Sequence, residues 1–97
     1  MKHLHAYYEG KVQGVGFRAS IMSLAKGYDV TGWVKNLPDG RVELFLSGDD
    51  NEVDDFLQGV QESHLAGHIE NVSVLPGAPE AGLKGFRIIG SLGSLAN

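Results

Sequence analysis

The spacing of hydrophobic residues changes after residue 12, from strict alternation to a helical period. The mainly apolar positions of one parity are Leu4, Ala6, Tyr8 and Val12, and the mainly polar positions of the other are His3, His5, Tyr7, Glu9 and Lys11. This alternation predicts a half-buried strand. Apolar residues then recur at helical intervals, at Phe17, Ile21, Leu24, Ala25 and Tyr28. That spacing predicts a helix over residues 17–27, with Gly27 as its C-terminal stop.

A β-hairpin is the next predicted feature. Residues 30–35 have the pattern of a strand that places Val30, Gly32 and Val34 on one face. The turn sequence Asn36-Leu37-Pro38-Asp39-Gly40-Arg41 follows, in which proline, aspartate and glycine each favour a tight reversal. A third strand then carries its apolar residues at Val42, Leu44 and Leu46. We therefore expect an antiparallel pair closed by residues 36–41.

The remaining elements are a second helix and two strands. Asp49 or Asp50 is expected to cap the helix, and Asp49 and Glu52 have the spacing of a capping box. The buried stripe of this helix is predicted to comprise Val53, Phe56, Leu57 and Val60. His64 and His68 are expected in a loop, because Gly67 interrupts a helical reading. Ile69, Val72 and Val74 indicate a fourth strand with an irregularity, residues 76–82 a loop, and residues 86–89 a last short strand.

The order of these elements defines the expected fold class. A β-α-β-β-α-β succession predicts an α+β, ferredoxin-like sandwich, in which an antiparallel sheet carries two helices on one face. The short C-terminal strand is an addition to that pattern. With 97 residues the chain is expected to form one domain over residues 1–90, followed by a flexible tail at 91–97.

The junction between the first strand and the first helix is the main candidate site. Residues 13–18, Gln13-Gly14-Val15-Gly16-Phe17-Arg18, place two glycines directly before a helix N-terminus. Such a turn directs unpaired backbone N–H groups and the positive end of the helix dipole at one point, which suits an anion. Arg18 opposes the dipole unless a phosphate lies in the turn. From this fragment alone, a phosphate ligand and a solvated surface arginine are both open.

Composition narrows the class of ligand. The net charge of −4 argues against a general nucleic-acid binder, yet four of the eight basic residues, Lys11, Arg18, Lys35 and Arg41, fall between residues 11 and 41. This suits a small anionic ligand. The absence of cysteine excludes disulfides, thiolate catalysis and cysteine-ligated zinc. There is no signal-peptide pattern and no stretch that could span a membrane, so we expect a cytoplasmic protein that binds no membrane.

Several other motifs are weaker. Gly14-x-Gly16-x-x-Ala19 matches a relaxed dinucleotide fingerprint, but no acidic residue lies about twenty positions later and a hairpin follows in place of βαβ units. No Walker A sequence is present. Ser23 and Lys26 match S-x-x-K but lack the partner motifs of that enzyme class, so they are ordinary helix residues. His3 and His5 share a strand face and are interpreted as exposed residues rather than metal ligands, because no third ligand is evident.

Two segments together resemble the acylphosphatase family. They are Gly10-Lys11-Val12-Gln13-Gly14-Val15-Gly16-Phe17-Arg18 and Gly32-Trp33-Val34-Lys35-Asn36, and Asp39-Gly40-x-Val42-Glu43 follows the second. The resemblance extends from about residue 4 to residue 57, and more loosely to residue 86. It departs from the family at residues 64–68, where many members carry a Gly-Pro pair, and in a longer C-terminal tail.

The resemblance implies an activity and a set of site residues. The family hydrolyses the mixed anhydride of a carboxylic acid and phosphate, without metal or other cofactor. Arg18 would bind the phosphate, Asn36 would hold the attacking water, and the phosphate cradle would comprise Gln13, Gly14, Val15, Gly16 and Phe17. The expected partners are a small acyl phosphate as substrate and inorganic phosphate as product and inhibitor, bound by a monomer. Because no His, Asp or Glu lies in the turn, we predict that no protein group acts as general base.

Other function classes remain as alternatives. The same fold and loop recur as a domain at the start of a carbamoyl-transferring hydrogenase-maturation protein, so a non-catalytic phosphate- or metabolite-binding module is one. That no further domain follows in this chain favours a free enzyme. A regulatory ferredoxin-like domain that dimerises through its sheet would need neither Arg18 nor Asn36. An RNA-binding sheet would need an aromatic pattern that the sequence lacks.

Overall fold

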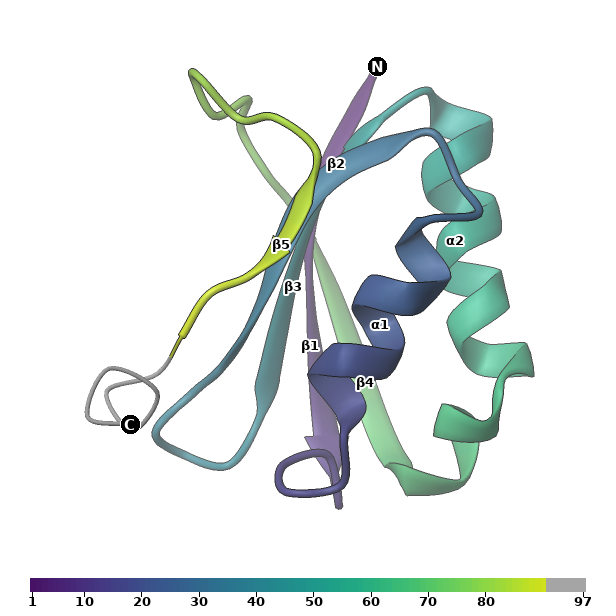
Figure 1. The fold of residues 1–97 in the computed structure, drawn as a ribbon, viewed down its shortest axis with the longest axis vertical. Helices are drawn as coiled ribbons and strands as arrows, with labels where there is room; N and C mark the ends of the chain where they lie inside the picture. Colours follow the sequence, from purple (N-terminus) through teal and green to yellow (C-terminus); the bar gives the residue numbers. More distant parts are fainter. Residues whose placement is uncertain (91–97) are drawn as a thin grey trace.

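Two helices and five strands account for most of the chain, and a computed structural model describes residues 1–90 (Figure 1). In chain order the elements are β1 (Lys2–Gly10), α1 (Phe17–Ala25), β2 (Val30–Asn36), β3 (Val42–Gly48), α2 (Asp50–Glu62), the 3-10 helix η1 (His64–His68), β4 (Ile69–Pro76) and β5 (Phe86–Ile88). Within this part of the chain, no helix is long and apolar enough to cross a membrane. The predicted tail at 91–97 lies outside the described residues.

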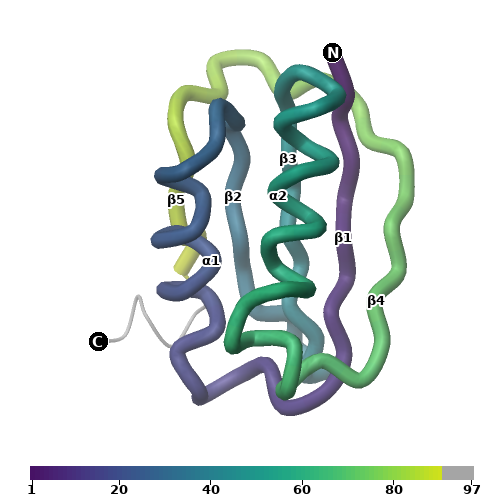
Figure 2. The backbone as a smooth tube through the Cα atoms, turned by 90° about the vertical axis from the view of Figure 1, so that its right-hand side faces the viewer, coloured from purple at the N-terminus to yellow at the C-terminus, as the bar shows by residue number. Residues whose placement is uncertain are grey.

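The strands form one sheet in the order β4-β1-β3-β2-β5. The four strands β4, β1, β3 and β2 pair antiparallel, and both helices cover one face of the sheet (Figure 2). The predicted ferredoxin-like α+β arrangement is confirmed. β5 pairs in parallel with the outer edge of β2, so the complete sheet is mixed. This places the C-terminal strand beside α1, an arrangement that matters for the site.

The main core lies between the helices and the sheet. Its fully buried residues come from the alternating apolar positions of the strands and from the apolar faces of the helices. They include Ala6, Val34, Leu44, Phe56 and Val60. Most of the residues that the pattern assigns to a core are therefore confirmed there. Burying each of the valine, leucine and phenylalanine side chains in this core contributes about 1.5–3 kcal/mol to the hydrophobic stabilisation.

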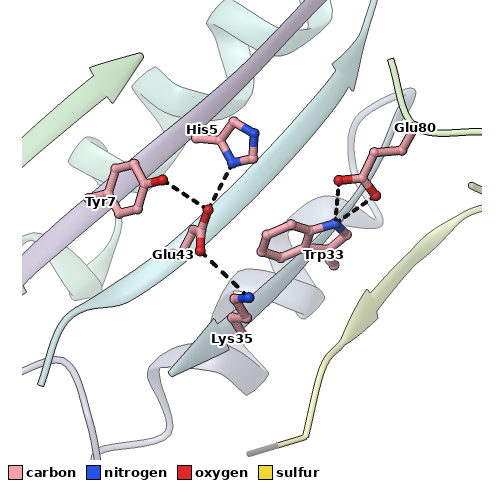
Figure 3. Close-up of polar contacts among 6 residues, drawn as sticks. All are labelled: His5, Tyr7, Trp33, Lys35, Glu43 and Glu80. Carbon is pink, nitrogen blue, oxygen red and sulfur yellow. Dashed lines mark hydrogen bonds and ion pairs between the residues drawn. The ribbon is translucent and has the colours of Figure 1, made fainter. Parts of the chain in front are cut away.

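The opposite face of the sheet holds a second, smaller buried cluster (Figure 3). Phe45 is fully buried although it has the parity of polar residues, and its ring lies 5.7 Å from Trp33 and 4.9 Å from His5. The Trp33 indole donates to the Glu80 carboxylate at 3.0 Å, so the segment after β4 covers this face. The alternation pattern places only Val42, Leu44 and Leu46 on the apolar face of β3, so it gives no indication of this second cluster.

Glu43 organises the polar part of that cluster. Its carboxylate accepts a hydrogen bond from the Tyr7 hydroxyl at 3.0 Å, lies 2.9 Å from His5 Nδ1 and pairs with Lys35 Nζ at 3.8 Å. Burial and the Glu43 contact raise the pKa of the Tyr7 phenol above its ordinary value. His3 contacts Ser47 Oγ at 2.7 Å. Both histidines are thus half-buried and hydrogen-bonded, and no three His, Asp or Glu gather as a metal site within residues 1–90.

Local details differ from the prediction in three places. α1 ends at Ala25, two residues early, and the segment to Tyr28 is a turn. The capping box at the start of α2 does not form, because the Asp49 side chain makes no cap and Glu52 accepts from the Asp29 backbone amide at 2.6 Å. Residues 64–68 form the 3-10 helix η1 rather than a loop, capped by the Ser63 hydroxyl. The predicted irregularity of the fourth strand is confirmed as a register shift opposite Glu9 and Gly10.

Gly32 is a position in the sheet where a side chain cannot fit. An added Cβ would overlap the carbonyl oxygen of Phe45 and lie 3.0 Å from its carbonyl carbon, both in the rigid backbone of β3. We expect Gly32→Ala to lower the free energy of unfolding by about 3 kcal/mol, measured by urea denaturation. The matched control is Gly67→Ala, whose Cβ would meet nothing within 4 Å. Equal stability of the two variants would refute the steric argument.

Candidate active site

The turn between β1 and α1 adopts the backbone conformation that its glycines allow. Gly14 and Gly16 have φ values of 77° and 76°, in the left-handed region that glycine tolerates best. Gly16 is the N-cap residue of α1, and the first intrahelical hydrogen bond runs from the Ser20 amide to its carbonyl at 3.0 Å. The backbone amides of residues 17–19 therefore precede the hydrogen-bonded ladder of the helix. They form the donor-rich helix N-terminus that the sequence predicts.

A cavity of about 190 Å³ opens at this helix N-terminus. Its lining comprises Val12, Gly14, Gly16, Phe17, Arg18, Ala19, Asn36 and Ile88. Asn36 is the last residue of β2, and the tip of the β2–β3 hairpin lies at the same end of the sheet as the 13–18 turn (Figure 1). The fold thus brings Arg18 and Asn36, which are 18 positions apart in the sequence, to one cavity.

Arg18 provides the positive charge of this cavity. Its Nη1 donates to the carbonyl oxygen of Ile89 at 3.5 Å, and the Ile89 amide in turn donates to the Val34 carbonyl at 2.9 Å. The first turn of α1 contains no acidic residue, and no carboxylate pairs with Arg18 within residues 1–90. The guanidinium is held by a neutral acceptor, so its charge is not neutralised by the protein and is available to an anion.

Two of the predicted cradle residues do not line the cavity. Gln13 directs its side-chain amide to the carbonyl oxygens of Leu37 and Arg41, at 2.8 and 2.9 Å. Val15 lies at the tip of the turn with its side chain 44% exposed. Gly14, Gly16 and Phe17 do line the cavity, together with Arg18 and Asn36. The Gln13 contacts suggest a structural role for that side chain.

The structure adds cavity residues that the sequence reasoning missed. Ile88 forms part of the wall because β5 pairs with β2 in parallel, with Ile88 opposite Val34. Val12 and Ala19 complete the lining. The strand period could identify Val12 as buried, but the pairing of a three-residue strand has no local sequence signal. The cavity therefore has an apolar wall beside its cationic and amide groups.

The acidic and phenolic groups nearest to the turn and the hairpin do not line the cavity. The lining residues include no His, Asp or Glu. Tyr8 lies beneath the turn, with its ring 5.4 Å from that of Phe17, and burial raises the pKa of its phenol so that it stays protonated. At the hairpin tip, the backbone amide and the guanidinium of Arg41 hold the pKa of the Asp39 carboxyl below its ordinary value. The Asp39 carboxylate is therefore engaged in hydrogen bonds within the hairpin turn.

Comparison with known proteins identifies relatives of this chain in both sequence and fold. The family model described as acylphosphatase matches residues 4–88. A protein named acylphosphatase from Nostoc sp. is 42% identical over 84 residues, which cover 87% of this chain and 82% of the relative. The crystal structure of acylphosphatase from Bacillus subtilis superposes with a TM-score of 0.81 at 32% identity, covering 92% of this chain and 99% of that one. HypF of T. kodakarensis also superposes, with a TM-score of 0.80 at 27% identity, covering 94% of this chain and only 12% of that one.

Proposed function

The chain belongs to the acylphosphatase family and hydrolyses acyl phosphates to carboxylate and inorganic phosphate, and from this premise we propose a role in the reaction for Arg18, Asn36 and the 13–18 turn. Arg18 and the backbone amides of the 13–18 turn bind the phosphate, and Asn36 orients the attacking water. The observation that carries this proposal is the shared cavity, which presents Arg18 and Asn36 together at the helix N-terminus.

Phosphate binding follows from the donors around the cavity. The backbone amides at the start of α1 and the helix dipole favour an anion, and the Arg18 guanidinium adds two parallel donors. In phosphoryl transfer, charge is spread over the three equatorial oxygens in the transition state, so fixed donors around them can supply most of the rate enhancement. An anion in the cavity also offsets the repulsion between the Arg18 guanidinium and the positive end of the helix dipole.

Asn36 is suited to position a water molecule rather than to deprotonate it. Its carboxamide can both accept and donate hydrogen bonds, and it has no basic form at neutral pH. The lining residues offer no carboxylate or imidazole as a base. In this scheme the water attacks phosphorus in line with the carboxylate leaving group, the P–O bond to the acyl oxygen breaks, and a phosphate oxygen of the substrate takes the proton of the water.

The direct test of the proposed site is hydrolysis of benzoyl phosphate by the purified protein and by the Arg18 and Asn36 variants. We expect inorganic phosphate to inhibit competitively, because product and substrate would share the same donors. Hydrolysis that is unaffected by both substitutions would reject the proposed site. The alternative, a non-catalytic phosphate-binding module, predicts phosphate binding without turnover.

Activity is expected to survive treatment with a chelator. The proposed scheme stabilises the phosphoryl charge with a guanidinium and backbone amides, so it has no step for a metal ion to perform. We expect kcat for benzoyl phosphate to be unchanged after dialysis against EDTA, measured with and without subsequent addition of Mg²⁺ or Zn²⁺. Loss of activity on chelation and its recovery with metal would contradict the scheme.

We also propose that the protein works as a monomer in the cytoplasm. Within one chain Arg18 and Asn36 already lie at one cavity, so no second copy is needed to bring these two proposed site residues together. The absence of cysteine is compatible with a reducing compartment. Sedimentation of the active protein at the mass of one chain, 10.4 kDa, would support the monomer.

A further inference from the structure

The side chain of Gln13 connects the 13–18 turn to the neck of the β2–β3 hairpin. Its Nε2 donates to the carbonyl oxygen of Leu37 at 2.8 Å and to that of Arg41 at 2.9 Å. Both protons of the carboxamide are used, on acceptors 24 and 28 residues away in the sequence. The two bonds lie in a part-buried environment, where competition from water is reduced.

The two acceptors flank the residue pair that contains Asn36. Asn36 pairs with Val42 at the end of the β2–β3 ladder, so Leu37 is the next residue on one side and Arg41 the preceding one on the other. The neck is itself closed by a hydrogen bond from the Leu37 amide to the Arg41 carbonyl at 2.8 Å. Gln13 therefore holds a rigid part of the hairpin, one peptide away from Asn36.

The other end of this connection is the phosphate turn. Gln13 directly precedes Gly14, the first residue of the turn with a left-handed backbone conformation. The hairpin neck is closed by its own local hydrogen bonds, whereas the 13–18 turn leads into α1, whose first hydrogen bond runs from the Ser20 amide to the Gly16 carbonyl. A displacement of one relative to the other would change the distance between Arg18 and Asn36 without unfolding either.

We propose that Gln13 is a positioning residue, which sets the distance between the phosphate cradle and Asn36 through its two hydrogen bonds. This inference rests on the proposed function, because it assigns Gln13 an effect on water attack that passes through Asn36. The Gln13 side chain does not touch the substrate; it fixes where the carboxamide of Asn36 lies relative to the bound phosphorus. Misplacement of a reacting group by about 1 Å costs about a hundredfold in rate, so a looser neck is expected to slow the reaction.

The first test is Gln13→Met, which keeps the length of the side chain and removes both donors. We expect kcat for benzoyl phosphate to fall about tenfold, while KM and the inhibition constant of phosphate change less than about twofold, since the alignment of the water is disturbed and not the phosphate donors. Gln58→Met is the matched control, because Gln58 is exposed on α2 and, within residues 1–90, its side-chain amide donates only to Glu62 on the same helix. A Gln13→Met enzyme with the kcat of the control would overturn the proposal, as would an equal loss in kcat and phosphate affinity.

The second test places the same substitution in the Asn36→Ala background. If Gln13 acts through Asn36, the double variant will have the kcat of Asn36→Ala, within about twofold. A double variant whose loss in kcat equals the product of the two single losses would overturn the positioning role. A normal kcat for Asn36→Ala alone would instead refute the proposed role of Asn36, so the two failures are distinguishable. Folding of Gln13→Met is checked by circular dichroism. If it does not fold, Gln13→Asn replaces it, which keeps the carboxamide but shortens the side chain by one methylene. The same changes in kcat and phosphate affinity then decide the proposal.

Discussion

Replacing Arg18 by alanine is expected to lower kcat/KM for benzoyl phosphate by about a thousandfold, the largest effect of any single change in the site. The guanidinium lines the cavity and is the only side-chain cation among its lining residues. Its removal leaves only backbone amides to balance the charge of the phosphoryl group. We expect a loss both in kcat and in the affinity for inorganic phosphate, because the same donors bind the ground state and the transition state.

Arg18→Lys separates charge from geometry. Lysine keeps the positive charge but lacks the planar fork that donates to two phosphate oxygens at once, so little activity is expected to return. Arg87→Ala on the exposed side of β5 is a suitable control for the loss of an arginine. Full activity of Arg18→Ala, measured by steady-state hydrolysis, would show that the phosphate binds elsewhere.

The fold and the positions of the two main proposed site residues were predictable because their signals are local. Two glycines between a strand and a helix specify the 13–18 turn, and Asn36 stands directly before a Pro-Asp-Gly turn. Once the β-α-β-β order is known, the end of β1 and the β2–β3 hairpin must lie at the same end of the sheet. The placement of Arg18 and Asn36 at a common cavity follows from this topology together with a few local motifs.

The contacts that complete the site depend on long-range pairing and were not predictable. The acceptors of Gln13 are the backbone carbonyl oxygens of Leu37 and Arg41. Because every residue has a backbone carbonyl, the sequence does not indicate which ones accept these hydrogen bonds. The wall at Ile88 depends on the parallel pairing of β5 with β2, which a three-residue strand does not reveal by its pattern. The burial of Phe45 was not predicted, because alternation identifies only one buried face, whereas the segment that follows β4 covers the other.

Asn36→Ala is expected to lower kcat by about a hundredfold while the inhibition constant of inorganic phosphate stays within about twofold of the wild-type value. The reason is that Asn36 comes from the end of β2 and not from the donor-rich start of α1, so its carboxamide is proposed to contact the water rather than the phosphate. The phosphate donors, Arg18 and the backbone amides, are unchanged in this variant. A split between kcat and phosphate affinity therefore distinguishes a water-positioning residue from a phosphate ligand.

The matched control for this prediction is Asn51→Ala, which removes an exposed carboxamide from α2, away from the cavity lining. Steady-state hydrolysis of benzoyl phosphate gives kcat, and competition by phosphate gives the affinity of the cradle. Equal losses of kcat and phosphate affinity in Asn36→Ala would make Asn36 a phosphate ligand, and unchanged kcat would remove it from the reaction. Only a loss confined to kcat is compatible with a site in which Arg18 and the backbone amides bind the phosphate and Asn36 positions the water.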